Sequence, residues 1–264
     1  MDAAAEAPIL VDRGDAAIAV VTLNRPDQRN AMKLRMWREL ADVFDGLAGE
    51  PALRAIILTG AGGAFCAGAD IKEFGEVRGN ADAAAVYAEA VERCNETIRR
   101  SPKATFAAVS GAAMGGGCGL ALCCDFRISD PTGYFGIPAA RLGLVYGVAE
   151  TRALVDAVGL ERAKEVLFTG RRFAAAEAQA IGFATEICEG DPVAAARVRA
   201  ETLRASAPLS IAGTKVVLAA LAPAPAAAAH AAIDAAVRRA MNSADYREGV
   251  AAFKEKRPPA FRGG

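Results

Sequence analysis

Two short turns of small residues carry the chemistry that this chain is best suited to perform. The first is Phe65-Cys66-Ala67-Gly68-Ala69-Asp70-Ile71-Lys72, and the second is Met114-Gly115-Gly116-Gly117-Cys118-Gly119. Each turn lies between an apolar strand-like segment and a helix-like segment. The N–H groups at the start of the following helix are therefore unpaired and point at a ligand. Two such turns brought together form an oxyanion hole.

Both turns resemble those of the crotonase superfamily, the enoyl-CoA hydratase/isomerase family. In that family one amide from each turn holds a thioester carbonyl as it becomes an enolate, so the resemblance assigns the two donors to Ala69 and Gly116. It extends from about Val20 to Phe261. Further matching motifs are Leu23-Asn24-Arg25-Pro26, Arg29-Asn30-Ala31, Phe135-Gly136-Ile137-Pro138, Leu167-Phe168-Thr169-Gly170 and Phe253-Lys254-Glu255-Lys256-Arg257.

The chain departs from the hydratases of this family at the two glutamates that carry out hydration. The resemblance places those positions at Gly119 and at Ala139, directly after Pro138. Hydration needs a base that activates water and an acid that protonates Cα, each worth about 10²- to 10⁴-fold in rate. We therefore expect ordinary hydration to be crippled. The acyl pocket is expected to be formed by Gly119, Pro138, Ala139 and Leu144. Because Gly119 and Ala139 are small, we expect it to have room for a bulkier acyl group.

Two titratable residues are candidates to replace the missing pair. By the resemblance Tyr146 lies on the wall of the acyl pocket, in a placement similar to that of the tyrosine of methylmalonyl-CoA decarboxylases. A phenol there can orient a carboxylate or return a proton, or it can serve only as a wall. Glu150 follows at an expected helix start, where the helix dipole favours a carboxylate whatever its role.

The resemblance also places the coenzyme A moiety of the substrate, and no further cofactor is expected. Arg29 and Lys72 flank the path of the adenosine phosphates and pantetheine, and the C-terminal motif approaches the adenine. Asp70 is in addition expected to cap the next helix. The residues assigned to coenzyme binding are Arg29, Ala67, Asp70, Ile71, Lys72, Phe253 and Lys256.

Composition argues against several other classes of protein. The 264 residues are 53% apolar, which allows one large core. Because 31 Lys and Arg balance 31 Asp and Glu, no net field steers the chain toward nucleic acid or an acidic membrane surface. Six cysteines without a Cys-x-x-Cys pair predict reduced thiols in a cytoplasmic protein. The one histidine, His230, is expected on an exposed helix, so no metal site is expected.

Two alternative patterns are weaker. The 21 residues of 104–124 carry no charge and are long enough to span a bilayer, but their five glycines favour a strand, a turn and a packed helix. Gly60 and Gly62 follow a predicted strand and begin a dinucleotide-binding fingerprint. Its third glycine position holds the bulky Phe65, which would keep the helix off the strand.

Periodicity predicts an α/β protein. A hairpin of residues 10–11 and 18–23 precedes a helix with Trp37, Leu40, Phe44 and Leu47 on one face, and a strand follows at 54–58. Strand, helix and strand in that order form a crossover unit of a mostly parallel sheet. Further helices are predicted at 81–100, 148–158 and 163–168. From 192 onward the chain is predicted helical, with breaks near 208, 222–225 and 243.

The resemblance implies a crotonase fold, in which a ββα spiral core over 1–191 holds the acyl-CoA pocket. The helical region over 192–264 would be the trimerisation region, covering a neighbouring subunit in a homotrimer or a dimer of trimers. We expect an enzyme that stabilises a thioester enolate as a non-standard lyase, isomerase or decarboxylase. Two alternatives stay open: a slow hydratase with relocated acid and base, and a non-catalytic acyl-CoA-binding protein.

Overall fold

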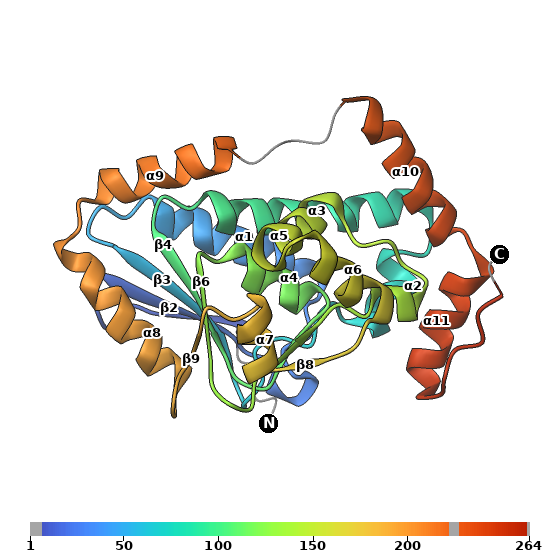
Figure 1. Ribbon diagram of the computed structural model, residues 1–264, viewed down its shortest axis with the longest axis horizontal. Helices are drawn as coiled ribbons and strands as arrows, with labels where there is room; N and C mark the ends of the chain where they lie inside the picture. The colour runs from blue at the N-terminus through green and yellow to red at the C-terminus, as the bar shows by residue number, and fades with distance from the viewer. Residues whose placement is uncertain (1–6, 222–226, 263–264) are drawn as a thin grey trace, which may run out of the picture.

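Two sheets organise the protein, whose computed structural model describes residues 7–221 and 227–262. The larger sheet has the order β1-β2-β3-β4-β6-β9 and the smaller one β5-β7-β8. β1 runs antiparallel to β2, and every other pair in the larger sheet is parallel. The strands are β1 (Ile9–Asp12), β2 (Ile18–Leu23), β3 (Ala55–Gly60), β4 (Ala104–Val109), β5 (Ala112–Met114), β6 (Phe126–Ser129), β7 (Tyr134–Gly136), β8 (Phe173–Ala174) and β9 (Glu186–Ile187). The predicted α/β class and the β2–α1–β3 crossover are confirmed (Figure 1).

The helices follow the predicted order with small differences at their ends. They are α1 (Leu34–Ala48), α2 (Phe74–Val77), α3 (Ala81–Arg100), α4 (Gly116–Cys123), α5 (Val148–Val158), α6 (Leu160–Thr169), α7 (Ala175–Ile181), α8 (Pro192–Glu201), α9 (Pro208–Leu221), α10 (Ala227–Met241) and α11 (Ala244–Glu255). α6 begins three residues before its predicted start, because Gly159 at φ +76° separates it from α5. The expected break at 222–225 and the side chain of His230 lie outside the described residues.

Both faces of the larger sheet are buried, which explains its apolar strands. In β3, Ile56 and Leu58 belong to the core cluster formed with α1, α3 and α4. Ile57, on the other face, packs in a second cluster with Ala196 and Ala200 of α8. α8 therefore completes the core of the sheet, although it follows residue 191.

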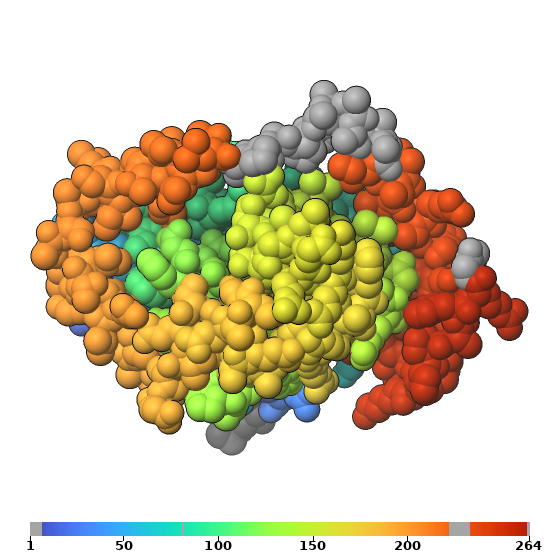
Figure 2. All heavy atoms as spheres, viewed as in Figure 1, coloured from blue at the N-terminus to red at the C-terminus, as the bar shows by residue number. Residues whose placement is uncertain are grey.

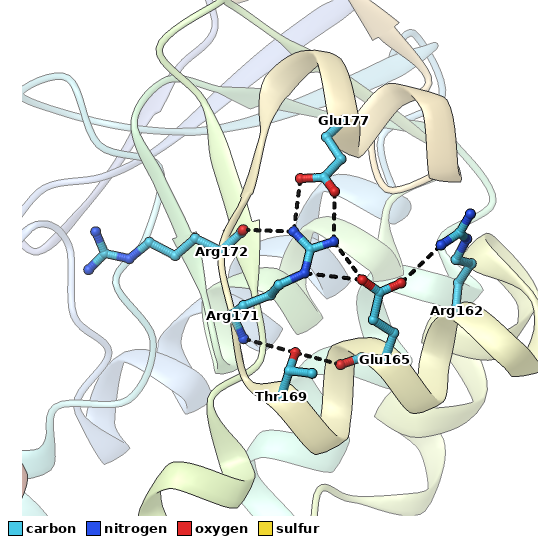
Figure 3. Close-up of polar contacts among 6 residues, drawn as sticks. All are labelled: Arg162, Glu165, Thr169, Arg171, Arg172 and Glu177. Atoms are coloured by element: carbon cyan, nitrogen blue, oxygen red, sulfur yellow. Dashed lines mark hydrogen bonds and ion pairs between the residues drawn. The ribbon is translucent and has the colours of Figure 1, made fainter. Parts of the chain in front are cut away.

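A cluster of charged side chains ties α6, β8 and α7 together (Figure 3). The Arg171 guanidinium lies 2.6 Å from a carboxylate oxygen of both Glu165 and Glu177. Its central carbon is 3.7 Å from the centre of the Phe173 ring. Single exposed ion pairs contribute little, but one guanidinium shared by two carboxylates and a ring fixes three elements at once.

The C-terminal helices lie at two ends of the molecule. α8 and α9 flank one end and α10 and α11 the other, with α5, α6 and α7 between them on the face shown in Figure 2. α9 has no buried residue, and Leu209, Val216 and Leu221 on it are exposed. Such an apolar surface is typical of an interaction site, and the assignment of 192–264 to oligomerisation stays a prediction. None of the described helices has both the length and the hydropathy to cross a bilayer.

Candidate active site

Backbone hydrogen bonds hold the two glycine-rich turns side by side. The Cys66 N–H donates to the Ala112 carbonyl oxygen at 2.7 Å, and the Met114 N–H donates to the Cys66 carbonyl oxygen at 2.9 Å. Gly68 has φ +101°, and a Cβ there would lie 2.7 Å from the Met114 carbonyl oxygen. Only glycine fits this close approach, so the sequence of the first turn allows the second to reach it.

The amides of Ala69 and Gly116 are neighbouring free donors on this surface. Gly116 is the first residue of α4, where an N–H has no partner within the helix. A Cβ on Gly116 would lie 3.7 Å from the Ala69 nitrogen and 3.1 Å from the Trp37 ring. Within the described chain, neither of the two amides donates to a protein acceptor. Both remain available to an oxygen in the adjoining cavity.

That cavity has a volume of about 1870 Å³ and extends from the turns to α10 and α11. It exceeds the roughly 300–1,000 Å³ of ordinary small-molecule sites, so it suits a long ligand. Every site residue predicted from the sequence lines it except Gly119. The lining ones are Arg29, Ala67, Ala69, Asp70, Ile71, Lys72, Gly116, Pro138, Ala139, Leu144, Tyr146, Glu150, Phe253 and Lys256.

The expectation that Gly119 leaves room in the acyl pocket is wrong, because two side chains occupy that space. A Cβ on Gly119 would lie 2.9 Å from the Tyr146 hydroxyl oxygen and 3.0 Å from Glu150 Oε1. A Cβ on Gly147 would lie 2.7 Å from Glu150 Oε2. Two glycines therefore make room for the Glu150 carboxylate, which stands where the resemblance places a glutamate on α4.

Glu150 and Tyr146 form one polar unit beside the turns. The Tyr146 hydroxyl donates to the Gly115 carbonyl oxygen at 3.2 Å, directly before the Gly116 amide, and lies beside the Glu150 carboxylate over Gly119. Burial raises the pKa of Glu150, although hydrogen bonds from Asn95 and other neighbours oppose the shift. Burial and the Glu150 charge raise the pKa of Tyr146 well above its usual value. The tyrosine is thus neutral at physiological pH, and the glutamate is biased toward holding a proton.

At Ala139, the second position that the resemblance assigns to a glutamate, no carboxylate of the described chain takes the place of the missing side chain. Ala139 is buried in a short 3-10 turn, Ala139–Leu142, and its carbonyl accepts the Leu144 N–H at 2.9 Å. The side chains of Pro138, Ala139 and Leu144 are apolar, so this part of the cavity wall cannot move a proton.

Four of the seven residues assigned to coenzyme A line the cavity with exposed side chains. Arg29, Lys72, Phe253 and Lys256 are exposed. Asp70 is buried, and its carboxylate accepts the Lys72 N–H at 3.2 Å, so the expected helix cap is present.

A second partner of Asp70 was not predicted. Arg25 lies 3.0 Å from the Asp70 carboxylate, and the side chains of both are largely buried. Because this pair neutralises the carboxylate, Asp70 holds the first turn in shape instead of repelling a phosphate.

Sequence reasoning missed Asn95 and Arg78. Asn95 Nδ2 donates to Glu150 Oε1 at 3.3 Å, from a residue only 3% exposed. The Arg78 charge acts on Glu150 as well. Neither residue belongs to a motif. Asn95 meets Glu150 only because α3 packs against α4, which in turn packs against α5, and Arg78 comes near because α2 packs against α3. Local spacing holds no signal of such a contact.

Comparisons with known proteins agree over nearly the whole chain. The sequence model of the enoyl-CoA hydratase/isomerase family matches residues 13–264. An enoyl-CoA isomerase/hydratase of Mycosarcoma maydis is 31% identical over 254 residues, which cover 92% of each protein.

Solved structures give the same result. An enoyl-CoA hydratase/carnitine racemase from Magnetospirillum magneticum is 37% identical with a TM-score of 0.79, and the match covers 98% of this chain and 97% of that one. A methylmalonyl CoA decarboxylase is 27% identical with a TM-score of 0.87, covering 98% and 99%. The chain therefore belongs to the enoyl-CoA hydratase/isomerase family of the crotonase superfamily and has the crotonase fold.

Proposed function

We propose that this protein acts on an acyl-CoA thioester and stabilises its enolate with the amides of Ala69 and Gly116. The observation that carries the proposal is the joint placement of two free amides and the Tyr146–Glu150 unit at one end of the cavity. Each donor of such a hole is worth about 3 to 4 kcal/mol of transition-state stabilisation. The thioester would lie along the cavity, with its phosphates near Arg29 and Lys72 and its adenine near Phe253 and Lys256.

The reaction is one that moves protons through a single acid–base unit. Hydration needs a base for water and an acid for Cα, whereas the second position holds Ala139. Isomerisation of a double bond and decarboxylation each proceed through an enolate and return a proton to it. Tyr146 and Glu150 can supply that proton. We therefore place the activity among isomerases, decarboxylases or related lyases, with no cofactor beyond coenzyme A.

Decarboxylation has one observation in its favour among these reactions. The methylmalonyl CoA decarboxylase structure superposes with the TM-score of 0.87 given above. A malonyl-type thioester therefore belongs in the first set of substrates tested, beside an unsaturated one.

The proposal is tested by exchange of the Cα proton in deuterated water, with turnover measured on a panel of enoyl-, dienoyl-, malonyl- and aryl-CoA thioesters. We expect exchange or turnover on at least one of them. Crotonyl-CoA should be hydrated far more slowly than by an enzyme with two glutamates. Hydration at an ordinary rate would show that Tyr146 and Glu150 replace both glutamates. The acid and base would then be relocated, as the slow-hydratase alternative states, but the enzyme would not be slow. Binding without any exchange or turnover would establish the non-catalytic alternative.

A further inference from the structure

Arg78 brings a positive charge to the cavity that holds Glu150. It ends α2 as the C-cap residue and lines the cavity with Tyr87 and Asn95. Its guanidinium carbon lies 4.4 Å from the centre of the Phe74 ring and 4.3 Å from that of Tyr87. The two rings meet edge to face, with their centres 6.1 Å apart, so they contact the guanidinium on two adjacent sides and hold it in place.

No carboxylate of the described residues lies within ion-pair distance of this guanidinium, although the charge of Arg78 is felt by Glu150. No hydrogen bond or ion pair joins its side chain to a described carboxylate, and its Nε is buried without any acceptor. Arg25, the other partly buried arginine near the first turn, is paired with Asp70 at 3.0 Å. Arg78 as a whole is half-buried, but a buried donor such as its Nε is nearly always paired in native proteins, and leaving it unpaired is costly. Arg25 is thus paired with a carboxylate, and Arg78 is not.

The position of Arg78 tells which part of a ligand would meet it. Its charge acts on Glu150 and on Tyr87, whose hydroxyl accepts the Trp37 indole N–H at 2.9 Å, and Trp37 packs on Gly116. The coenzyme residues Arg29 and Lys256 lie on other elements of the cavity lining. The anion that Arg78 lacks therefore belongs to the acyl group, not to the phosphates of the coenzyme.

We propose that the acyl group carries a carboxylate bound by Arg78, so that the substrate is the coenzyme A thioester of a dicarboxylic acid. This inference rests on the proposed function, since it names the substrate class of the same site. A guanidinium is planar and presents its N–H groups as a fork that matches the two oxygens of a carboxylate. The aliphatic tail of a monocarboxylic acyl group would offer this cation no anion.

The experiment compares thioesters that differ only in replacing the carboxylate by an isopropyl group of the same branching. One pair is glutaryl-CoA and 5-methylhexanoyl-CoA, with the carboxylate at the chain end. The other is malonyl-CoA and 3-methylbutanoyl-CoA, with the carboxylate on Cα. Titration calorimetry gives the dissociation constants. In at least one pair we expect the carboxylate to bind about tenfold tighter or more, as for a charge-assisted hydrogen bond. The pair that responds locates the carboxylate.

Variants separate this role from a structural one. Arg78→Met should reduce the preference for the carboxylate to within about twofold, while Arg78→Lys, which keeps the charge without the fork, should retain part of it. Arg93→Met makes the same change on α3, at a residue paired with Asp42 and Asp45 outside the cavity. It should leave the preference intact. A purely structural Arg78 would lower stability in the variant without changing the ratio within a pair.

Equal affinities within both pairs of the unmodified protein would overturn the inference, whatever the variants do. Exchange at Cα on an unsubstituted acyl-CoA would then leave the proposed function standing. A clear preference for carboxylates without any exchange or turnover would support the role of Arg78 in binding, but it would contradict the proposed catalytic function.

Discussion

The two chemical regions of the cavity are built from different parts of the chain. The region that would hold the thioester oxygen uses backbone amides of Ala69 and Gly116, whose positions depend on glycine conformations and bridges between turns. The proposed acid–base region uses the side chains of Tyr146, which lies in the segment before α5, and Glu150, which lies on α5. A backbone donor survives most changes of side chain, whereas a proton donor is lost with one substitution. One region can therefore keep its geometry while the other is rebuilt.

A comparison with carboxylates elsewhere in the molecule shows what is unusual about Glu150. Glu165 and Glu177 share Arg171 at the surface, and these pairs lower the pKa of both (Figure 3). Glu150 is half-buried in the cavity wall and forms no such ion pair with a described residue, so desolvation raises its pKa. A group biased toward protonation in a cavity is typical of a catalytic acid or base.

The largest effect is expected from removing one backbone donor. Gly116→Pro deletes the N–H at the first residue of α4, where proline is tolerated, and should lower the rate by about 10²- to 10³-fold or abolish it. Affinity for free coenzyme A should persist. Gly116→Ala is the matched control, since it adds a Cβ 3.1 Å from Trp37 but keeps the donor. If the two variants lose activity equally, crowding against Trp37 explains the loss and the hole does not.

A smaller effect is expected where the two regions touch. Gly119→Ala inserts a methyl group 2.9 Å from the Tyr146 hydroxyl and 3.0 Å from Glu150, so both side chains must shift. Misplacement of this size should cost between about tenfold and a hundredfold in kcat with a modest loss of stability. Gly46→Ala, where a Cβ meets nothing within 4 Å, should be harmless.

A double-mutant cycle sharpens that test. In Tyr146→Phe the crowding oxygen is absent, so the stability cost of Gly119→Ala should shrink in that background. Thermal unfolding of the four proteins measures the coupling. Strict additivity would contradict the contact between Gly119 and Tyr146.

Tyr146→Phe alone tests which side chain governs the reaction. If the phenol transfers or orients a proton, kcat should fall by at least about tenfold while KM stays nearly unchanged. An unchanged kcat together with collapse in Glu150→Gln would move the role to Glu150, with Tyr146 as a wall. Steady-state kinetics on the substrate found by the panel distinguishes these outcomes, and no effect in either variant would favour a non-catalytic protein.

Elements with local signals were predictable, and contacts between distant elements were not. The apolar face of Trp37, Leu40, Phe44 and Leu47 marks α1, and the small residues of the two turns mark the ends of strands. The space at Gly119 was misjudged because its occupants lie 27 and 31 residues away along the chain and fold back through α5. A glycine in a sequence shows that a side chain is absent, but only the fold shows what takes its place.

The smallest expected effect concerns pH, and it comes from the hydrogen bond that Asn95 donates to Glu150. Burial raises the pKa of Glu150, and the hydrogen bond from Asn95 opposes that shift by stabilising the charged form. Asn95→Leu removes the donor at nearly constant volume, so the pKa should rise further. If Glu150 acts as a base, the acid limb of the kcat profile should move to higher pH by less than about one unit, in line with a single hydrogen bond.

Protein stability should report the same change without a substrate. Because the folded pKa lies above the unfolded one, the folded state binds more protons between the two values. Stability is then highest below the unfolded pKa and falls as the pH rises through the folded pKa. In Asn95→Leu this fall should extend to higher pH, and in Glu150→Gln it should vanish. Thermal unfolding of the three proteins from pH 4 to 8 would show it, and parallel curves would mean that Asn95 does not act on the Glu150 proton.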